Sequence, residues 1–482
     1  MNMRLYLFLL GRIALLNAAV LGLPLGCALY WGEDTVLAFA GPLAVTLVLG
    51  LLLKTAGKQH KKQLGVAEGA WYLLSIWFLL GLIGMMPYVW TGMLTPADAF
   101  FESVSAYTTT GISLLAAGQA EAHSLLFWHS LMEWMGGLNF IIMLVTVVPQ
   151  VSGCFGVTLS AHQSIAFSPM ISRMRNAALQ TGKIYAGITI ISALLYLAAG
   201  MNVFEAINQA MTTASTSGGT TSLDFAGYDN SFLEIAAMIS MILASCNFLL
   251  IWRALSRREL RSIFSDTELR TFLAIVGAVS ALIVFHLWRS GVYDFWQSLR
   301  YGTFAVVSFL STTGYASAQF SLWPGFDRYV LFLLVFAGGC IGSATGGLRI
   351  MRIIVLFRMA AREMRRTLHP QMVVSLKIDG VSVSMKIISR VLSFFFLYMG
   401  VFFFSMLVIS LSGIPLLQSM GVAAGCLSSV GSTAELYGLA SYASLPVWTK
   451  LYCTFVMILG RIEIFSFLIV LQTIAARFHS KW

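Results

Sequence analysis

Charged side chains are scarce in this chain of 482 residues. Asp, Glu, Lys and Arg make up 10% of it and hydrophobic residues 58%, with a mean hydropathy of +0.82. A soluble protein of several domains is excluded, because its surface would need far more charge. In a soluble protein the net charge of +10 would suggest a nucleic-acid partner. Here the basic residues lie between long apolar runs, so we expect contact with membrane lipid and none with nucleic acid.

Residues that build catalytic or metal sites are also sparse. The six cysteines stand singly with no CxxC spacing, which leaves disulfides and metal clusters without support. The seven histidines are scattered, and the sequence has neither an HExxH motif nor a nucleophile elbow. We therefore expect no enzyme active site and interpret the histidines as packing or interfacial residues.

Four short stretches, in contrast, repeat one pattern. Each has a threonine or serine, one further residue, a glycine, and then another small or polar residue. They read TTTGIS at 108–113, STSGGTTS at 215–222, STTGYAS at 311–317 and SSVGSTAE at 428–435. Their key glycines are Gly111, Gly218, Gly314 and Gly431. One unit thus recurs four times in a membrane-like chain.

The chain around these stretches divides into four similar units, in which an apolar helix, a shorter apolar stretch, the glycine loop and a second apolar helix follow one another. The units are 68–150, 180–255, 270–360 and 388–478, and two further transmembrane helices occupy 1–67. Their second helices are expected at 125–149, 232–252, 329–357 and 447–475. The stretch before each glycine has about 10–18 residues, too few for a comfortable crossing, and fits a re-entrant half-helix. We expect an all-α polytopic membrane protein with four pseudo-symmetric helix–pore-loop–helix repeats around one pore.

The glycine loops have the composition of a cation filter. Glycine lets carbonyl groups turn to one side without a Cβ clash, and a neighbouring Thr or Ser offers a further oxygen. Non-helical backbone at membrane depth is tolerated only where protein buries it or where it lines water. Close helix packing by small residues is the alternative, but four motifs in register favour the pore. The candidate cation ligands are Thr110, Gly111, Ile112, Ser217, Gly218, Gly219, Thr313, Gly314, Tyr315, Val430, Gly431 and Ser432.

A glycine-rich segment, AGGCIGSATGG at 337–347, lies in the middle of the apolar stretch 329–357. Each glycine weakens a helix by about 1 kcal/mol relative to alanine, so we expect this segment to unwind into a loop below the filter. A packing surface of small residues is the alternative. The residues of this candidate gate are Gly338, Gly339, Gly342, Ser343, Thr345, Gly346 and Gly347.

Arg461 lies in GRIEIF, 460–465, within the last apolar stretch. A guanidinium at membrane depth is costly unless it faces water, the bundle interior or an acid. Glu463, two positions on, points to another part of the helix surface, so a pair within the helix is not expected. A cation on a cation pathway would raise the barrier to passage, which makes Arg461 a candidate gate residue. A buried structural ion pair is the alternative.

The basic residues also predict a topology. They cluster between the units and at the C-terminus, whereas the segments after the glycine loops are poor in Lys and Arg. The positive-inside rule then places both termini in the cytoplasm and the four loops on the outer side. The third unit fits least well, because Arg289, Arg300 and Arg328 fall on its outer half.

The four glycine loops, GGCIGSATGGLR at 338–349 and GRIEIF together resemble the Trk/Ktr/HKT superfamily of cation transporters, over nearly the whole chain. The two extra N-terminal helices resemble its Trk branch more than its shorter Ktr branch. The resemblance implies K⁺ uptake across a bacterial cytoplasmic membrane by a homodimer with one pore per subunit. It implies that the key glycines line the filter, that 337–347 obstructs the pore beneath it and that Arg461 lies near this constriction. The implied regulatory partner is a cytoplasmic nucleotide-binding ring of the TrkA type, docked on the basic inner face.

The four glycines bear on the choice of ion. Some members of the superfamily carry serine for the first filter glycine and favour sodium, whereas all four positions are glycine here, so the resemblance favours potassium. Arg349 stands where lysine is often expected, without altering the class. A sodium-selective or non-selective cation transporter of the same fold stays an alternative, which ion-replacement currents would separate. A polytopic membrane enzyme is less favoured, because no catalytic residues cluster on one membrane face.

Overall fold

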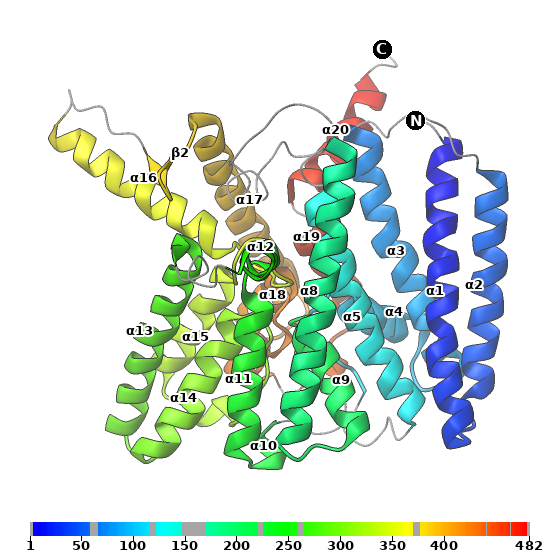
Figure 1. Cartoon of the computed structure of the whole chain (residues 1–482), viewed down its shortest axis with the longest axis horizontal. Coiled ribbons are helices and arrows are strands. Elements are labelled where there is room, and N and C mark those ends of the chain that lie inside the picture. The colour runs from blue at the N-terminus through cyan, green and yellow to red at the C-terminus, as the bar shows by residue number, and fades with distance from the viewer. Residues whose placement is uncertain are drawn as a thin grey trace.

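The computed structural model describes residues 3–57, 66–115, 122–146, 170–219, 225–258, 265–369, 376–439, 441–462 and 464–479. The described residues are almost entirely helical (Figure 1). A small antiparallel hairpin pairs β1 (Lys377–Ile378) with β2 (Val381–Ser382). Six described helices are long and apolar enough to cross a membrane, or up to eight if each of two bent pairs is one span. The fold is therefore that of an all-α polytopic membrane protein, as the sequence predicts.

Two long helices, α1 (Met3–Trp31) and α2 (Val36–Ala56), pack together at one edge of the bundle (Figure 1). The other helices repeat one order of long, short and second helix. The long helices are α3 (Val66–Trp90), α8 (Met170–Ala198), α13 (Thr267–Arg289) and α17 (Met385–Ser410). The short helices are α4 (Pro96–Tyr107), α9 (Val203–Ala214), α14 (Phe295–Leu310) and α18 (Leu416–Ser428).

The second helices complete each unit. They are α5 (His123–Thr146), α11 (Ser231–Ser245) with α12 (Phe248–Arg257), α15 (Gly325–Ala337) with α16 (Ile350–Leu368), and α19 (Val447–Ile462) with α20 (Ile464–His479). Single-turn and 3₁₀ elements are α10 (Phe225–Tyr228), η2 (Phe320–Leu322), η3 (Gly431–Tyr437) and η4 (Tyr442–Ser444).

Local sequence signals start the short helices. The side chains of Thr95, Asn202 and Asp294 each accept a hydrogen bond from a backbone N–H in the first turn of α4, α9 or α14. Such caps satisfy one of the four N–H groups that a helix start leaves free. The fourth short helix follows Pro415, whose fixed φ suits a helix start. These caps fix where each half-helix begins, and hence where its loop falls.

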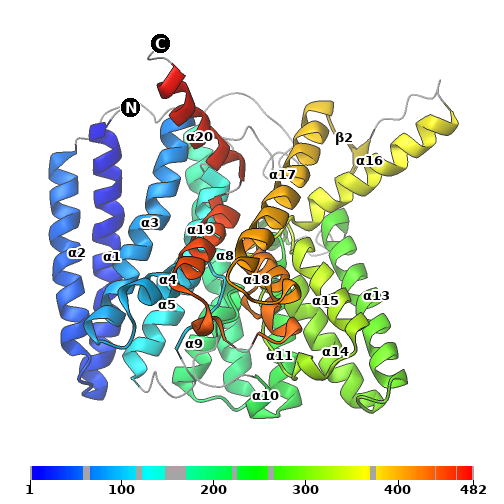
Figure 2. The ribbon, with the colours of Figure 1, turned by 180° about the vertical axis from the view of Figure 1, so that it is seen from behind.

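The units pack around a closed cycle. Within each unit the short helix contacts its own second helix, as α4 contacts α5. The second helix also contacts the short helix of the following unit: α5 packs on α9, α11 on α14, α15 on α18, and α19 returns to α4. Helices far apart in the sequence, such as α4 and α19, therefore lie side by side (Figure 2). This closure directs the four loops towards one centre.

Two of the second helices differ from the prediction. Continuous helices were expected over 232–252 and 447–475, but α11 and α12 meet at 91° and α19 and α20 at 107°. The first break falls at Cys246 and Asn247, where the Asn247 side chain caps α12 by accepting from two backbone N–H groups. Hydropathy does not reveal this break, because apolar residues continue through it. Between α15 and α16, residues 338–349 leave the helix, as the glycines predict.

Contacts between units account for two of the three basic residues that fit the topology rule poorly, Arg300 and Arg328. The Nε of Arg300 lies 2.7 Å from a carboxylate oxygen of Glu234, and its Nη2 lies 2.9 Å from Asp229. Arg328 donates to the Leu436 carbonyl at 3.2 Å. These arginines serve local pairing between neighbouring units, so their position says little about orientation.

Candidate functional site

The four short helices end in the same turn. The residue two positions before each key glycine has a positive φ: Thr109 (52°), Thr216 (54°), Thr312 (58°) and Ser429 (58°). The next N–H donates to the carbonyl five residues earlier at 2.9–3.1 Å, in the pairs Thr110–Ser105, Ser217–Thr212, Thr313–Ser308 and Val430–Gly425. Positive φ strains a residue with a side chain, yet it occurs at the same place four times. The repeat seen in the sequence is thus a repeat of backbone geometry.

The first three loops touch one another in chain order. A Cβ placed on Gly111 would lie 1.7 Å from the carbonyl oxygen of Ser217, and one on Gly218 would lie 1.7 Å from that of Thr313. Both glycines also have a positive φ, of 71° and 70°. Glycine is required here twice over, by backbone conformation and by the approach of the next loop.

The fourth loop closes the ring. A Cβ on Gly314 would lie 2.9 Å from the Ser432 hydroxyl, and one on Gly431 would lie 2.8 Å from the carbonyl oxygen of Thr110. The N–H of Gly431 donates to that same Thr110 carbonyl at 2.8 Å. The four predicted loops therefore come together as one ring, in the order loop 1, 2, 3, 4 and back to 1.

Gly431 departs from the fourfold pattern. Its φ is not among the positive values that Gly111, Gly218 and Gly314 share, and it begins the 3₁₀ helix η3. Its carbonyl accepts a hydrogen bond of 3.0 Å from the Tyr442 hydroxyl. The fourth glycine is needed for space rather than for backbone conformation, and its carbonyl is partly engaged by protein.

Several buried hydroxyl groups in the ring make no hydrogen bond to another described residue. They are those of Thr109, Thr216, Ser217, Ser429 and Ser432. A buried hydroxyl without a partner loses roughly 1–3 kcal/mol, which a cation or a water could restore. Three of these residues stand two positions before a key glycine and were missed as candidate ligands. The recurring Thr or Ser at that position was the signal that could have identified them.

The short helices also shape the electrostatics of the ring. Each ends three or four residues before its key glycine, so its C-terminal end faces the loop. The free carbonyls of a helix C-terminus carry partial negative charge, and each favours a nearby cation by roughly 0.3–1 kcal/mol. Four such ends around one centre make the ring attractive to a cation.

The Tyr315 side chain supports the ring from behind, because its hydroxyl bonds to α9. That hydroxyl lies 2.6 Å from the Thr212 oxygen and 2.9 Å from that of Thr213, both on α9. The side chain is fully buried. Tyr315 thus braces loop 3 against the short helix of the second unit. Only its backbone remains a candidate ligand, and its carbonyl already accepts a hydrogen bond of 2.8 Å from the Ser308 hydroxyl.

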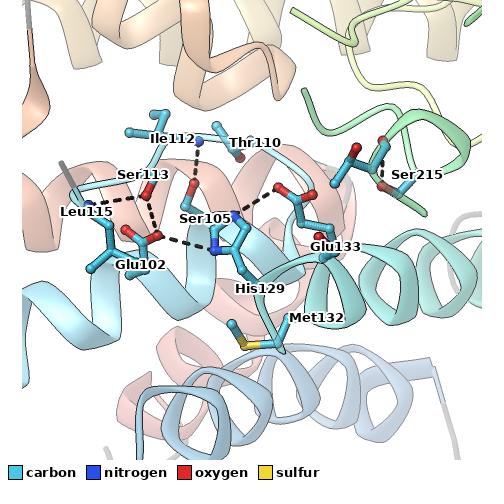
Figure 3. Close-up of polar contacts among 12 residues, drawn as sticks. Glu102, Ser105, Thr110, Ile112, Ser113, Leu115, His129, Met132, Glu133 and Ser215 are labelled. Atoms are coloured by element: carbon cyan, nitrogen blue, oxygen red, sulfur yellow. Dashed lines mark hydrogen bonds and ion pairs between the residues drawn. The ribbon is translucent and has the colours of Figure 1, made fainter. Parts of the chain in front are cut away.

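Behind loops 1 and 2 lies a buried cluster of Glu102, His129 and Glu133 (Figure 3). The two ring nitrogens of His129 each lie 3.2 Å from a carboxylate oxygen, one of Glu102 and one of Glu133. Glu102 also accepts from the Ser113 hydroxyl at 2.7 Å and from the Leu114 N–H at 2.6 Å. The cluster therefore holds the residues that follow Gly111 in loop 1, Ser113 and Leu114.

The cluster reaches loop 2 through Glu133. A Cβ on Gly219 would lie 2.1 Å from Glu133 Oε1. The other oxygen, Oε2, is buried and has no hydrogen-bond partner among the described residues. Two carboxyl groups share one imidazole in this cluster, so it can bring net negative charge close to the ring and favour a cation there. His129 was expected to be a packing or interfacial residue, and its spacing of four residues from Glu133 on one helix was the signal that could have identified this pair.

The segment 338–349 lies directly against the ring. The Gly346 N–H donates to the Thr312 hydroxyl at 3.0 Å, and a Cβ on Gly346 would lie 2.1 Å from the Ser428 carbonyl. The Cys340 N–H donates to Ser245 at the break between α11 and α12, at 2.9 Å. The segment thus links loops 3 and 4 to the broken helix of the second unit.

Internal and external hydrogen bonds hold the shape of this segment. The Ser343 hydroxyl lies 2.6 Å from that of Thr345, which accepts from the Gly339 N–H at 3.2 Å. From outside, Glu268 at the start of α13 accepts from Ile341 at 2.8 Å and from Met351 at 3.2 Å. The sequence did not identify Glu268, which holds the segment at Ile341 and the first turn of α16 at Met351.

Arg461 connects the segment to the ring. Its Nε donates to the Thr108 carbonyl at the end of α4 at 2.5 Å, and its Nη1 donates to the Ala344 carbonyl at 3.0 Å. The side chain is 1% exposed. Glu463, the acid nearest in sequence, lies outside the described residues. The structure therefore places Arg461 in contact with both the end of α4 and the candidate gate.

Phe140 on α5 completes this region. Its ring lies 4.2 Å from the Arg461 guanidinium and 5.3 Å from that of Arg349. Cation–π contact in a desolvated site contributes on the order of 2 kcal/mol. A phenylalanine in an apolar helix carries no such signal in the sequence, so Phe140 was not predicted.

Comparison of the sequence with known protein families points to a cation transporter, in agreement with the closed ring and the adjoining segment. Residues 37–478 match the family model of TrkH, described as a cation transport protein. The chain belongs to the TrkH family. That membership sets aside a membrane enzyme, because the family consists of transporters.

Individual members of the TrkH family match almost end to end. The chain is 30% identical to the Trk system potassium uptake protein TrkH of Halomonas elongata, over 98% of each protein. It is 30% identical to the Trk system potassium uptake protein TrkG of Escherichia coli strain K12, over 93% of each. The crystal structure of the potassium transporter TrkH from Vibrio parahaemolyticus superposes with a TM-score of 0.90 at 26% identity, covering 98% of this chain and 99% of that one.

Proposed function

We propose that this chain takes up K⁺ across a bacterial cytoplasmic membrane, with the four glycine loops as its selectivity filter. The observation that supports this most is the closure of the loops into one ring at the ends of four half-helices. Relatives that match over nearly their whole length are named potassium uptake proteins. Backbone oxygens, hydroxyls and helix ends at one centre can replace the water around a dehydrated cation.

The segment 338–349 and Arg461 form the gate in this proposal. They adjoin the ring through Gly346 and through Thr108, so an ion that leaves the filter meets them next. A guanidinium there repels a cation in a medium of low dielectric constant. Movement of the segment away from the ring would open the path.

The proposed orientation has both termini in the cytoplasm. The start of α1 and the end of α20 lie at the same end of the bundle, and the basic helix α16 projects beyond it (Figures 1 and 2). Basic segments on one side follow the positive-inside rule. The filter then faces outward and the gate lies on the cytoplasmic side of it.

Growth of a host that lacks its own K⁺ uptake tests the function. Expression of this chain, with and without a co-expressed TrkA-type ring, should restore growth at low K⁺. Uptake assays in which Na⁺ replaces K⁺ distinguish potassium uptake from the sodium-selective alternative, which predicts Na⁺ entry at least equal to that of K⁺. Absence of growth despite correct insertion and co-expression would contradict potassium uptake.

The buried cluster leads to a prediction. Glu133→Gln keeps the shape of the side chain but removes its charge next to loop 2. We expect the apparent affinity for K⁺ to fall about fivefold to tenfold, equivalent to roughly 1–1.4 kcal/mol. Concentration-dependent Rb⁺ uptake in cells measures this change.

Glu205→Gln is the matched control for that experiment. Glu205 lies in the first turn of α9, far from the glycine of its loop, and accepts a hydrogen bond from Tyr228 at 2.9 Å. Its neutralisation should leave the K⁺ affinity unchanged. Equal affinities in the Glu133 variant and the unmodified protein would show that the cluster has only a structural role.

A second prediction concerns the regulatory partner. Helix α16 carries Arg362, Arg365 and Arg366 beyond the bundle, and α12 ends at Arg257. Reversing these charges to Glu should weaken association with a TrkA-type ring in a salt-sensitive way, by about tenfold or more at low salt. Pull-down at two salt concentrations measures it.

Insertion must be checked in the same variants, because these arginines also set topology. Reversal of Arg253 alone, earlier on α12, is the control for reversal of Arg257 alone, because the two changes alter the net charge equally. If the TrkA-type partner still binds after the three α16 arginines and Arg257 are reversed, and the protein inserts normally, the docking site lies elsewhere. Cross-linking of the purified protein would test the proposed homodimer in parallel.

A further inference from the structure

A cavity of about 310 Å³ lies between α1, α3, α4 and α5. Its polar lining comes from Arg12, Asn17, Tyr72 and Asn139, and the rest is largely apolar. A second cavity of about 240 Å³ shares Ile13, Tyr72 and Asn139 with it and extends along α3 and α5. Together they form an elongated space, with a cationic group at its wall and a mainly apolar interior.

Arg12 stands at the level of a membrane boundary. A Cβ on its neighbour Gly11 would lie 2.5 Å from the backbone nitrogen of Lys54, which is in the last turn of α2. The 29-residue helix α1 is roughly 43 Å long, and Arg12 lies roughly 14 Å from its start. The part of α1 from Arg12 to Trp31 is roughly 28 Å long, which is about the thickness of the hydrocarbon core, so with Trp31 at one membrane boundary Arg12 lies at the other, on the side of the N-terminus.

The guanidinium of Arg12 has no ionic partner in the protein, as far as the described residues show. Their salt bridges do not include it. The side chain is exposed rather than buried. An arginine at this depth favours an anion, and its planar fork suits a phosphate in particular.

We propose that this space binds an anionic phospholipid, with its phosphate on Arg12 and an acyl chain along the apolar lining. A free phosphate ion would satisfy the same guanidinium, but it would leave the apolar length of both cavities unfilled. The hydroxyl of Tyr72 and the amide of Asn139 offer hydrogen bonds to the glycerol region. Lipid recognition of this kind combines one or a few basic residues with apolar burial.

The site adjoins the base of the filter. Tyr107, on the cavity wall, is the last residue of α4, and its hydroxyl donates to Asn17 at 3.1 Å. Its backbone carbonyl is closely packed, because a Cβ on Gly136 would lie 1.9 Å from it. A bound lipid therefore contacts the residue that leads directly into loop 1, and its loss should loosen that end of the short helix.

The experiment measures lipid retained by the full chain. The protein is reconstituted in nanodiscs of phosphatidylcholine containing a minor fraction of phosphatidylglycerol, and co-purifying phosphatidylglycerol is counted by native mass spectrometry. Arg12→Gln should reduce specific retention about fivefold, the factor expected for one basic residue near an anionic surface. Ile13→Trp keeps the charge but fills the shared wall of the two cavities, and should reduce retention as well.

Arg270→Gln is the matched control. Arg270 lies in the first turns of α13, outside this space, and its loss changes the net charge equally. It should retain phosphatidylglycerol like the unmodified protein. Should Ile13→Trp fail to fold, Leu16→Phe narrows the same cavity with a smaller change.

Two results would overturn the proposal. One is equal retention in Arg12→Gln, Arg270→Gln and the unmodified chain, which would mean that lipid binds through net charge alone. The other is displacement of the lipid by millimolar inorganic phosphate, which would identify a soluble anion as the ligand. Failure of K⁺ uptake would not affect either measurement, so this inference stands or falls separately from the proposed function.

Discussion

Replacing Gly111 with serine is expected to lower the preference for K⁺ over Na⁺ about tenfold or more, since roughly 1.4 kcal/mol of lost discrimination is a factor of ten. A side chain there meets two obstacles. The φ of 71° is unfavourable for any residue with a Cβ, and that Cβ would lie 1.7 Å from the Ser217 carbonyl oxygen. The carbonyl has to move, and selectivity depends on the number and field of such oxygens. Uptake of Rb⁺ relative to Na⁺ measures the change.

Gly92→Ser is the control, because it separates backbone strain from contact with the filter. Gly92 lies between α3 and α4 with the same φ of 71°, but a Cβ there meets nothing within 4 Å. Its substitution should leave selectivity intact, even if it lowers the amount of protein.

The effects of serine at Gly218 and at Gly314 should differ according to what surrounds each glycine. Gly218 should resemble Gly111, because its Cβ would also lie 1.7 Å from a carbonyl oxygen. Gly314 should be milder, since its nearest neighbour is a hydroxyl at 2.9 Å that can rotate. Unchanged Rb⁺ to Na⁺ ratios in well-expressed serine variants at all four positions would remove the filter assignment.

The sequence predicts those parts of the architecture that depend on local patterns, such as segment length, glycine content and an isolated charge. Half-helices are visible because 12 to 16 apolar residues cannot span a bilayer and are followed by glycine. The loop at 338–349 is visible because five glycines weaken one helix. Arg461 stands out because a charge inside an apolar run needs an explanation.

The parts that sequence reasoning missed depend on contacts between distant segments. Glu268 holds a segment some seventy residues further along by accepting from backbone N–H groups. Every residue except proline has such a group, so the sequence does not single out these partners. Phe140 becomes informative only when two arginines lie beside its ring. The break at Asn247 was hidden because one capping amide, not a change in hydropathy, turns the chain by 91°. Of the two partners of His129, Glu133 is four residues away on the same helix, whereas Glu102 is brought to it by the fold.

Neutralising Arg461 to alanine is expected to raise the basal cation flux, measured without the partner ring, by about tenfold, which corresponds to lowering a barrier by roughly 1.4 kcal/mol. The guanidinium bridges the Thr108 and Ala344 carbonyls, so its loss removes both a positive charge and a tie between filter and gate. Deleting residues 343–345 should raise the flux similarly. It removes the bonded pair of Ser343 and Thr345, and the Ala344 carbonyl with it. Flux of ⁸⁶Rb⁺ into proteoliposomes measures both changes.

The double variant tests whether the two elements act as one gate. Each single change already breaks the bond between Arg461 and Ala344, so the second change cannot break it again. The combined increase should therefore exceed either single increase but stay below their product. Lys450→Ala is the matched control, since Lys450 is a buried cation on the same helix α19 that pairs with Asp98 at 2.7 Å, away from the segment. It should not raise basal flux. Wild-type flux in both single variants, with normal folding and membrane amount, would rule out this gate, and a full product in the double variant would mean two independent barriers.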